Sequence, residues 1–352
     1  MCFLKVEKIS HKESRDKMGK VLGIGECMIR LSSQRGQRLL NSTQLDLTYG
    51  GAEANVMANL AQLKHKTKFA SKIPDNSMSH NLVRHFRGMG VDCDPIVYGG
   101  DRLGSYFVEV GTGLRPSSVI YDRAYSSISM MEEIEWDLDE LFEDVTLLHI
   151  TGITLGLSKA WHDLGVEIIK AAKERDIKIS FDMNYRQKMW SHEEARSVYE
   201  KVLPFVDYLN AGKLDAIHFM DSDEVEEEPG CWQYYMKHIA SKYPNIKFLY
   251  GTNRHMITPN SYKMSGYIWD TGEQKAYESK EYRMDTVVDR IGAGDSFAAG
   301  ILHGFIEENP LQEVVEFGMA ASVLKHTVSG DVNLFSLSEI ENFMVNTSNV
   351  IR

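Results

Sequence analysis

The sequence predicts an α/β protein: an αβα sandwich with a mostly parallel central sheet and a small separate β-sheet. Short apolar runs alternate with longer segments of helical periodicity, and this rhythm is typical of a parallel sheet covered by helices on both faces. Of the 352 residues, 43% are hydrophobic, which is enough for the core of one large domain. Two stretches rich in β-branched, aromatic and glycine residues interrupt the rhythm and predict the small sheet.

The elements follow from the apolar pattern in chain order. Strands are expected at residues 21–31, 146–152, 177–184, 206–210 and 246–251. Helices are expected at residues 52–63, 77–89, 158–175, 192–203 and 232–242, and the segment from 294 to about 327 reads as helical throughout. Residues 1–18 are polar and precede the first strand, so we expect a disordered extension followed by one domain over 19–352.

The interrupting stretches are residues 39–49 and 96–127. Within the second, residues 106–108 and 119–121 read as short strands joined by a glycine- and proline-containing turn. We expect segments from about 31–49 and 96–127 to form a sheet that stands off the main domain and acts as a lid.

Composition excludes several classes of protein. A net charge of -11 argues against nucleic acid as a partner. The cysteines are far apart and form no C-x-x-C, so they indicate neither a disulfide framework nor a zinc site, and a reducing cytoplasm fits. No apolar run reaches the ~18 residues needed to span a membrane. An acidic chain that binds an anion must gather arginines locally.

Residues 289–300 read DRIGAGDSFAAG, a side-chain-poor turn placed just before a helix. Glycines there let an anion approach the unpaired N–H groups of the first helical turn. Gly292, Ala293 and Gly294 would form an anion hole for a transferring phosphoryl group, and Asp295 would accept the proton of the attacking hydroxyl. A tight turn in which Asp295 only favours the positive helix end is the structural alternative. The segment is neither a Walker P-loop nor a dinucleotide fingerprint.

A second segment, YGGAEANVMANLAQL at residues 49–63, adds specificity. Together with DRIGAGD it resembles the two signatures of the PfkB/ribokinase family of sugar kinases. The first signature is matched, with slight spacing variation, by Gly50, Gly51, Ala52, Asn55, Ala58, Leu60 and Ala61. The resemblance covers about residues 20–345. It implies a ribokinase-like fold with a β-sheet lid, ATP as phosphoryl donor and Mg²⁺ as its companion, with no metal ligand identified.

Within the family, the segments GGAEAN, RLGSYF, VIYDRAYSSIS and FDMNYRQKMW resemble 2-keto-3-deoxygluconate kinases (2-dehydro-3-deoxygluconokinases). The resemblance implies contacts with the sugar acid from Gly50, Gly51, Asn55, Tyr106, Tyr121, Arg123 and Arg186. Arginine suits a carboxylate because its planar fork donates two hydrogen bonds. Ordinary structural roles stay open: surface ion pairs for the arginines, strand packing for the tyrosines, a helix-entry turn for Gly51, a cap for Asn55 and a strand-end turn for Asp182.

The resemblance also implies a nucleotide site near the C-terminal turn. Its expected residues are Asn184, Asn210, Gly251, Thr252, Gly292, Gly294 and Lys325, with His255 near them. Two departures from the family pattern stand out. Arg290 replaces a threonine beside a monovalent-cation site of some relatives, and Lys213 replaces a glutamate that helps to order magnesium. These leave potassium dependence and the magnesium-ordering residues open.

The leading hypothesis is an ATP-dependent kinase that phosphorylates the terminal hydroxyl of 2-keto-3-deoxygluconate. A PfkB-type kinase for a neutral ketose such as fructose is one alternative, and a non-catalytic sugar sensor on the same fold is another. A nicotinamide-dependent oxidoreductase is more remote. The configuration at C4 of the substrate stays open. A homo-oligomer formed through the lid would cover one face of the small sheet.

Overall fold

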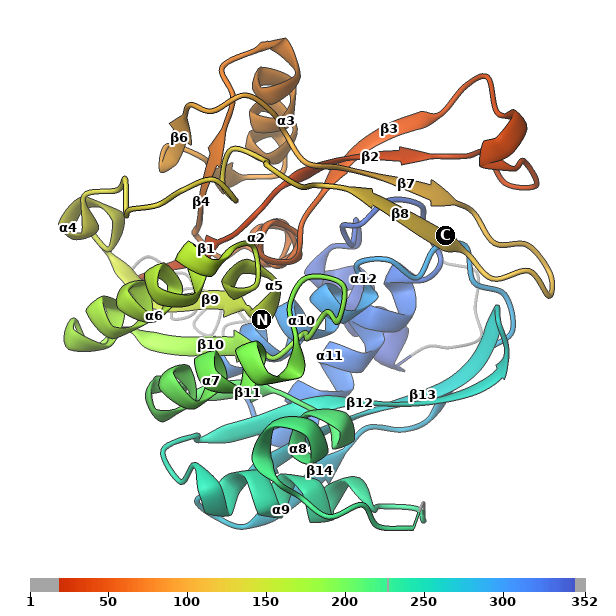
Figure 1. Cartoon of the computed structure of the whole chain (residues 1–352). Coiled ribbons are helices and arrows are strands. Elements are labelled where there is room, and N and C mark those ends of the chain that lie inside the picture. The colour runs from red at the N-terminus through yellow and green to blue at the C-terminus, as the bar shows by residue number, and fades with distance from the viewer. Residues whose placement is uncertain (1–18, 227, 346–352) are drawn as a thin grey trace, which may run out of the picture.

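The structure is a computed structural model that describes residues 19–226 and 228–345. Its large sheet contains β1 (Lys20–Ile24), β4 (Thr67–Ile73), β5 (Val91–Asp92), β6 (Ile96–Tyr98), β9 (Val145–Thr151), β10 (Lys178–Asp182), β11 (Tyr208–Asn210), β12 (Phe248–Thr258), β13 (Ser261–Asp270), β14 (Lys275–Glu278) and β15 (Tyr282–Met284). The order across this sheet is β14-β13-β12-β11-β10-β9-β1-β4-β5, with β15 paired to β13 and β6 paired to β4 (Figure 1).

The centre of the sheet is parallel from β4 through β1, β9, β10 and β11 to β12. Strands β13, β14 and β15 extend it in antiparallel pairing. After β1 the chain first adds β4 on one side and later adds β9 on the other. Strand order therefore reverses at β1, and open α/β sheets bind ligands at the carboxyl ends of the strands beside such a reversal.

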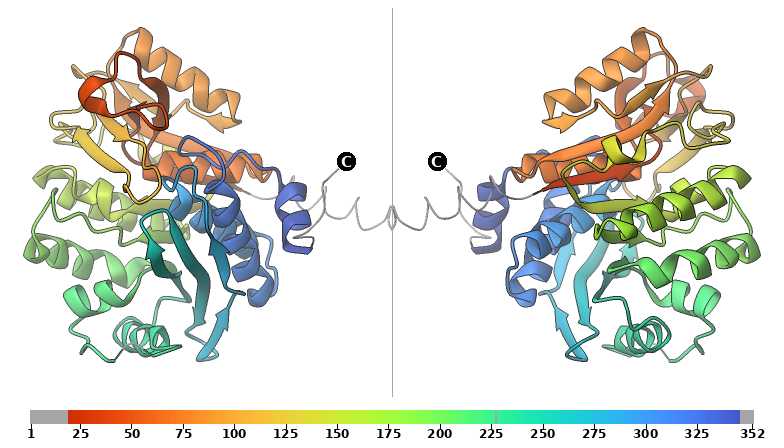
Figure 2. Two further views of the ribbon diagram at one scale, coloured as in Figure 1. Left: turned by 90° about the vertical axis from the view of Figure 1, so that its right-hand side faces the viewer. Right: turned by 90° about the vertical axis from the view of Figure 1, so that its left-hand side faces the viewer.

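Helices cover both faces of the large sheet (Figure 2). One apolar core is shared by α6 (Lys159–Glu174), α7 (His192–Val202), α8 (Lys213–Met220) and α9 (Trp232–Lys242). The other is shared by α2 (Ala52–Gln62), α3 (Ser77–Gly88), α10 (Ala293–Ile306) and α11 (Leu311–Lys325). The shorter elements are α4 (Leu138–Leu141), α5 (Gly152–Leu155), α12 (Leu337–Val345), η1 (Leu39–Asn41) and η2 (Leu203–Phe205).

A second sheet of four strands contains β2 (Met28–Ser32), β3 (Asp46–Gly50), β7 (Ser105–Glu109) and β8 (Ser118–Asp122) in the order β3-β2-β7-β8. Figure 1 shows it projecting beside the large sheet, on the side toward which the β12–β13 hairpin also extends. Tyr106 and Tyr121 lie opposite each other in its register, as do Phe107 and Ile120. Alternate residues therefore divide between a face toward the main domain and a face away from it.

The predicted fold class is confirmed: a mostly parallel sheet lies between helices, and a small sheet stands apart from it. The strand expected over residues 21–31 is wrong as one element, because the chain leaves the large sheet at Gly25 and enters the small one at Met28. The helix expected from 294 to 327 is divided, since α10 ends at Ile306 and Pro310 precedes α11. Residues 1–18 lie outside the described residues.

No helix within residues 19–226 or 228–345 combines the length and the apolarity needed to cross a membrane.

Candidate active site

A cavity of about 600 Å³ opens at the carboxyl ends of the parallel strands. Its wall brings together Glu26 after β1, Ile153 after β9, Asp182 at the end of β10, and Tyr121 from the small sheet. Residues 290–295, which include the glycine-rich turn, form another part of the wall. Segments from the whole length of the chain thus meet at the position that the strand order favours.

The turn before α10 has two glycines with different reasons to be glycine. Gly292 is the N-cap residue with φ 80°, and an added Cβ would lie 1.8 Å from the carbonyl oxygen of Asp331. At Gly294 an added Cβ would meet no heavy atom within 4 Å. The fold therefore requires the first glycine, whereas the second keeps open a space beside the first-turn N–H groups, where an anion can approach.

Asp295 lies in the first turn of α10 and lines the cavity. Its Oδ2 accepts a hydrogen bond of 2.6 Å from Nδ2 of Asn55, whose Oδ1 accepts one of 3.3 Å from the N–H of Gly51. Burial raises the pKa of Asp295 to about 7, and the Asn55 hydrogen bond opposes that rise. Asn55 thus joins the start of α2 to the start of α10, and the carboxyl group titrates where a general base is effective.

Glu53 fixes the start of α2 on the central strands. Its Oε1 accepts hydrogen bonds from the N–H of Thr151 at 3.0 Å, from Oγ1 of Thr151 at 2.8 Å and from Oγ1 of Thr154 at 2.7 Å.

Gly51, the N-cap residue of α2, lines the cavity, and an added Cβ would lie 2.1 Å from the carbonyl oxygen of Glu26. Gly50 is not part of the cavity wall, and its Cβ would meet Oδ2 of Asp331 at 2.2 Å. Close packing thus explains both glycines.

Two further carboxyl groups follow from Asp295 toward the second cavity wall: Asp182 lies near Asp295, and Asp215 lies near Asp182. Burial raises the pKa of Asp182 to about 8, and the charge of Asp295 adds to this effect. Burial also raises the pKa of Asp215 to about 6. Asp215 caps α8, where its Oδ2 accepts a hydrogen bond of 2.8 Å from the N–H of Gly212. The sequence pattern missed Asp215 because the family pattern has its acidic residue at position 213, where this chain has Lys213.

On the side of the small sheet, Arg123 is paired with a buried carboxylate. Its Nε and Nη2 lie 2.7 and 2.5 Å from Oε2 of Glu26, and its guanidinium lies 5.8 Å from the centre of the Tyr121 ring. Glu26 is 3% exposed and its other carboxylate oxygen has no hydrogen-bond partner among the described residues. The sequence analysis missed Glu26. Its position just after the first strand was the available signal, because ligands bind at the carboxyl ends of such strands.

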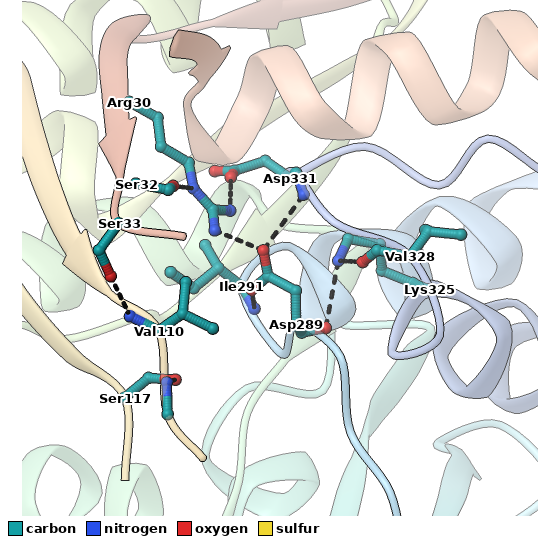
Figure 3. A network of polar contacts seen from close by, with 12 residues as sticks. Arg30, Ser32, Ser33, Val110, Ser117, Asp289, Ile291, Lys325, Val328 and Asp331 are labelled. Carbon is teal, nitrogen blue, oxygen red and sulfur yellow. Dashed lines mark hydrogen bonds and ion pairs between the residues drawn. The ribbon is translucent and has the colours of Figure 1, made fainter. Parts of the chain in front are cut away.

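Tyr106 contacts a buried network of charged groups formed by Arg30, Asp289 and Asp331, which Figure 3 shows. Its hydroxyl donates a hydrogen bond of 2.5 Å to Oδ2 of Asp331. Arg30, on β2, lies between Asp331 and Asp289 and forms an ion pair with each. These contacts connect the small sheet to the segment just before the glycine turn. Because they join residues 225 to 301 positions apart, local sequence patterns could not reveal them.

Lys325 lies in the same network and does not line the cavity. It is 0% exposed, and its Nζ donates hydrogen bonds to the carbonyl oxygens of Asp289 at 3.3 Å and Val328 at 3.4 Å. Burial lowers its pKa, while Asp289 and Asp331 oppose that effect. A direct contact between Lys325 and a nucleotide stays a prediction. His255 is exposed on β12, outside the wall of this cavity.

A second cavity, of about 450 Å³, shares Asp182, Asn184, Arg186 and Thr252 with the first. Asn210 and Gly251 line it as well. The nucleotide residues predicted on β11 and β12 thus line one cavity, which adjoins the cavity that contains the glycine turn. Lys213 forms an ion pair of 2.9 Å with Glu224.

The first cavity is lined by four arginines, although the chain is acidic overall: Arg123, Arg186, Arg254 and Arg290. Arg186 is exposed, and its Nη1 donates a hydrogen bond of 3.1 Å to the carbonyl oxygen of Tyr185. Arg254 and Arg290 are exposed too, and sequence reasoning did not name them as ligand contacts. This local excess of positive charge suits phosphate and carboxylate ligands.

Comparison with known proteins agrees with this arrangement. A 2-dehydro-3-deoxygalactonokinase from Haloferax volcanii is 30% identical over 92% of this chain and 96% of its own length. A 2-dehydro-3-deoxygluconokinase structure from Thermotoga maritima is 35% identical, with a TM-score of 0.88, over 93% of this chain and 100% of that one. A PfkB family carbohydrate kinase structure from Listeria grayi is 41% identical, with a TM-score of 0.89, over the same shares. The profile of the pfkB family carbohydrate kinases matches residues 18–242 and 265–336, and the chain belongs to that family.

Proposed function

We propose that the protein phosphorylates 2-keto-3-deoxygluconate with ATP at the terminal hydroxyl and forms 2-keto-3-deoxy-6-phosphogluconate. The observation that carries the proposal is Asp295, which stands at the start of α10 in a cavity lined by four arginines, with its pKa raised to about 7. A carboxylate at that place can accept a hydroxyl proton, while the helix start and the arginines accommodate anions.

In the proposed reaction, a carboxylate oxygen of Asp295 accepts the proton of the terminal hydroxyl. The sugar oxygen forms a bond to the γ-phosphorus of ATP, the bond from that phosphorus to the β,γ-bridging oxygen breaks, and ADP leaves with the electron pair. N–H groups of the turn at Gly292–Asp295 stabilise the charge on the transferring group. Asp295 then loses its proton to solvent. Closure of the small sheet would exclude water from the cavity and limit hydrolysis of ATP.

The cleft also suits a magnesium ion. Oxygen ligands are those that Mg²⁺ prefers, and Asp182 and Asp215 present two half-buried carboxyl groups, whose pKa values burial raises and the positive charge of the nearby Arg186 lowers. These two residues are our candidates for holding Mg²⁺ directly or through water. The ion, when bound with ATP, neutralises phosphate charge.

The identity of the sugar acid depends on the arginines and on the relatives. Glu26 balances the charge of Arg123, so Arg123 needs no substrate carboxylate as its partner. Arg186 is then our first candidate for the substrate carboxylate. The two relatives named for 2-dehydro-3-deoxy sugar acids differ in the sugar, galactonate in one and gluconate in the other. A neutral ketose remains a second candidate, because the free oxygen of Glu26 can accept a hydrogen bond from a sugar hydroxyl.

The test is a coupled assay of ADP formation with 2-keto-3-deoxygluconate, 2-keto-3-deoxygalactonate and fructose. We expect kcat/KM for a sugar acid to exceed that for fructose by a wide margin, because a neutral sugar leaves charged donors unpaired. Equal values or a preference for fructose would reject the sugar acid but keep the kinase. No turnover of any sugar would favour the non-catalytic sensor.

Arg186→Ala provides the sharper comparison. A charge-assisted hydrogen bond contributes about 1.5–3 kcal/mol, so KM for the sugar acid should rise by roughly 10–100-fold, with a smaller change in KM for ATP. Arg196→Ala is the matched control, since Arg196 lies outside both cavities and pairs with Asp221. If only KM for ATP rises, Arg186 serves the nucleotide, because it lines both cavities.

A further inference from the structure

Side-chain hydrogen bonds connect helices α2 and α10 near both of their ends. At their starts, beside the active site, Asn55 donates its hydrogen bond to Asp295. Beyond the other end of α2, Nε2 of His65 lies 2.7 Å from Nδ1 of His303, in the last turn of α10. The two helices therefore run side by side in the same direction. His303 lies eight residues after Asp295, or about 12 Å along the helix axis at ~1.5 Å per residue, so the histidine pair is outside the active site.

The histidine pair has a carboxylate beside it. Glu307 follows His303 by four residues at the end of α10, a spacing that brings both side chains to the same face of the helix. One ligand atom from each of His65, His303 and Glu307 lies within 4.8 Å of the other two. The histidines are 8% and 4% exposed, and Glu307 is half-buried. Two imidazoles and one carboxylate from two separate segments thus converge on one small volume.

This set of donors has a clear chemical preference. Imidazole nitrogen and carboxylate oxygen bind Zn²⁺ and its first-row neighbours at about 2.0–2.2 Å, whereas Mg²⁺ prefers oxygen alone. Ligands at such bond lengths around a tetrahedral ion are about 3.3 Å apart. The two histidine nitrogens, 2.7 Å apart, are slightly closer than that, and no two of the three ligand atoms are more than 4.8 Å apart. Small side-chain rotations would therefore bring the three atoms to the spacing that the ion needs.

We propose that His65, His303 and Glu307 form a binding site for a divalent transition-metal ion, Zn²⁺ foremost, distinct from the cleft proposed above for Mg²⁺. Without the ion, one of the two facing nitrogens carries the proton of the hydrogen bond. On binding, that ring takes its proton on the other nitrogen, and both facing nitrogens donate lone pairs to the ion. The carboxylate of Glu307 supplies the third ligand and water completes the coordination.

The expected consequence is a bridge between the segment after α2 and the end of α10. An ion that binds the folded chain and not the unfolded one raises thermal stability by mass action. Protons compete for the same imidazole nitrogens, so affinity should fall as pH drops below the range in which histidine is neutral. The proposal does not depend on which sugar the active site phosphorylates.

The test is titration of the metal-stripped full chain with Co²⁺, followed by visible absorption, and with Zn²⁺, followed by calorimetry. We expect one equivalent of Co²⁺ with an absorption band of a low-coordinate nitrogen-ligated site, displaced by Zn²⁺, and a Tm raised by Zn²⁺. His65→Gln and His303→Gln should each weaken binding by at least about 10²-fold, more than the loss of an outer-shell partner typically costs. Glu307→Gln should weaken it as well.

His80→Gln is the control, because His80 is exposed, pairs with Asp75 and should leave binding unchanged. The histidine variants keep Asp182 and Asp215, so binding that persists in them belongs to the cleft and overturns the proposal. Absence of saturable binding of Co²⁺ or Zn²⁺ to the wild type also overturns the proposal. The contact between His65 and His303 would then be only a structural hydrogen bond. Should a histidine variant fail to fold, the wild type and Glu307→Gln decide, since equal affinities of these two would exclude the site.

Discussion

Asp295 is the residue on which the proposed chemistry depends most. It is the acidic residue of the first turn of α10 and lines the cavity. Asp295→Asn keeps the size of the side chain and its place beside Asn55, but an amide cannot accept the hydroxyl proton. We expect kcat to fall by roughly 10²–10⁴-fold while ATP still binds. Rapid-quench or steady-state kinetics, with nucleotide binding measured separately, will check this. A variant with near-normal kcat would show that another group is the base.

The surroundings of Asp295 lead to a prediction about pH. Burial raises its pKa to about 7, and Asp331 and Glu53 add to the rise, so the carboxyl group becomes protonated and inactive as pH falls through about 7. The profile of kcat/KM should therefore have an acidic limb near that value. Asn55→Leu removes a hydrogen bond that lowers this pKa, so the limb should move to higher pH. A limb that stays in place or moves down would contradict the assignment.

At the scale of elements, the turn before α10 contains one glycine that we expect to serve function and another that we expect to serve folding. Gly294→Val places a side chain where no neighbouring atom lies within 4 Å, so the fold should persist while phosphate approach is blocked. Losing one anion-stabilising donor typically costs ~10²–10³ in rate. Gly292→Ala should instead lower Tm, because Gly292 has φ 80° and packs against the backbone of Asp331. Kinetics and thermal unfolding of both variants will test this. A stable, active Gly294→Val would move the phosphate site elsewhere.

The same elements show what the sequence could predict. The helix expected at 232–242 matches α9, and α2, α3, α6 and α7 end within a residue or two of expectation, because their apolar periodicity is local. Strands β4, β5, β13, β14 and β15 were not predicted, and β2 was merged with β1. Strand β6 falls in the segment expected to form the lid, but it pairs with β4 of the large sheet. What separates β1 from β2 is pairing with different partner strands, and that information is not local.

The residues of the candidate site also fall into two groups, those that the sequence predicted and those that it did not. Asp295, Asn55 and the glycines follow from short motifs, and the cavity brings Asp295, Asn55, Gly51, Gly292 and Gly294 together. Glu26, Arg30 and Asp331 were missed, since their importance depends on contacts with distant segments. Asp215 was missed because the position at which an acid was expected holds Lys213. Arg123 was named as a ligand contact, but no pattern in the sequence pairs it with Glu26.

At the scale of the whole molecule, one face of the small sheet is left partly exposed by residues 19–226 and 228–345. Leu47, Leu31, Phe107 and Ile120 lie next to each other in register across its four strands. Leu47 is 43% and Ile120 57% exposed, whereas the neighbouring row contains the buried Arg30 and Tyr106 and faces the main domain. An apolar row on an exposed sheet is a typical place for association, and a two-fold dimer would bury it against its own copy.

We therefore predict a homodimer formed through the small sheets. Light scattering after size-exclusion chromatography should give about twice the chain mass of 40.0 kDa for the wild type. Ile120→Lys should give the monomer, because a dimer would bury its charge without a partner. Met130→Lys is the control: Met130 is similarly exposed, at 55%, but lies outside the small sheet. A wild type that is monomeric at micromolar concentration contradicts the prediction. A dimer that Ile120→Lys leaves intact assigns the interface to another surface, because the two copies then meet without this row of side chains.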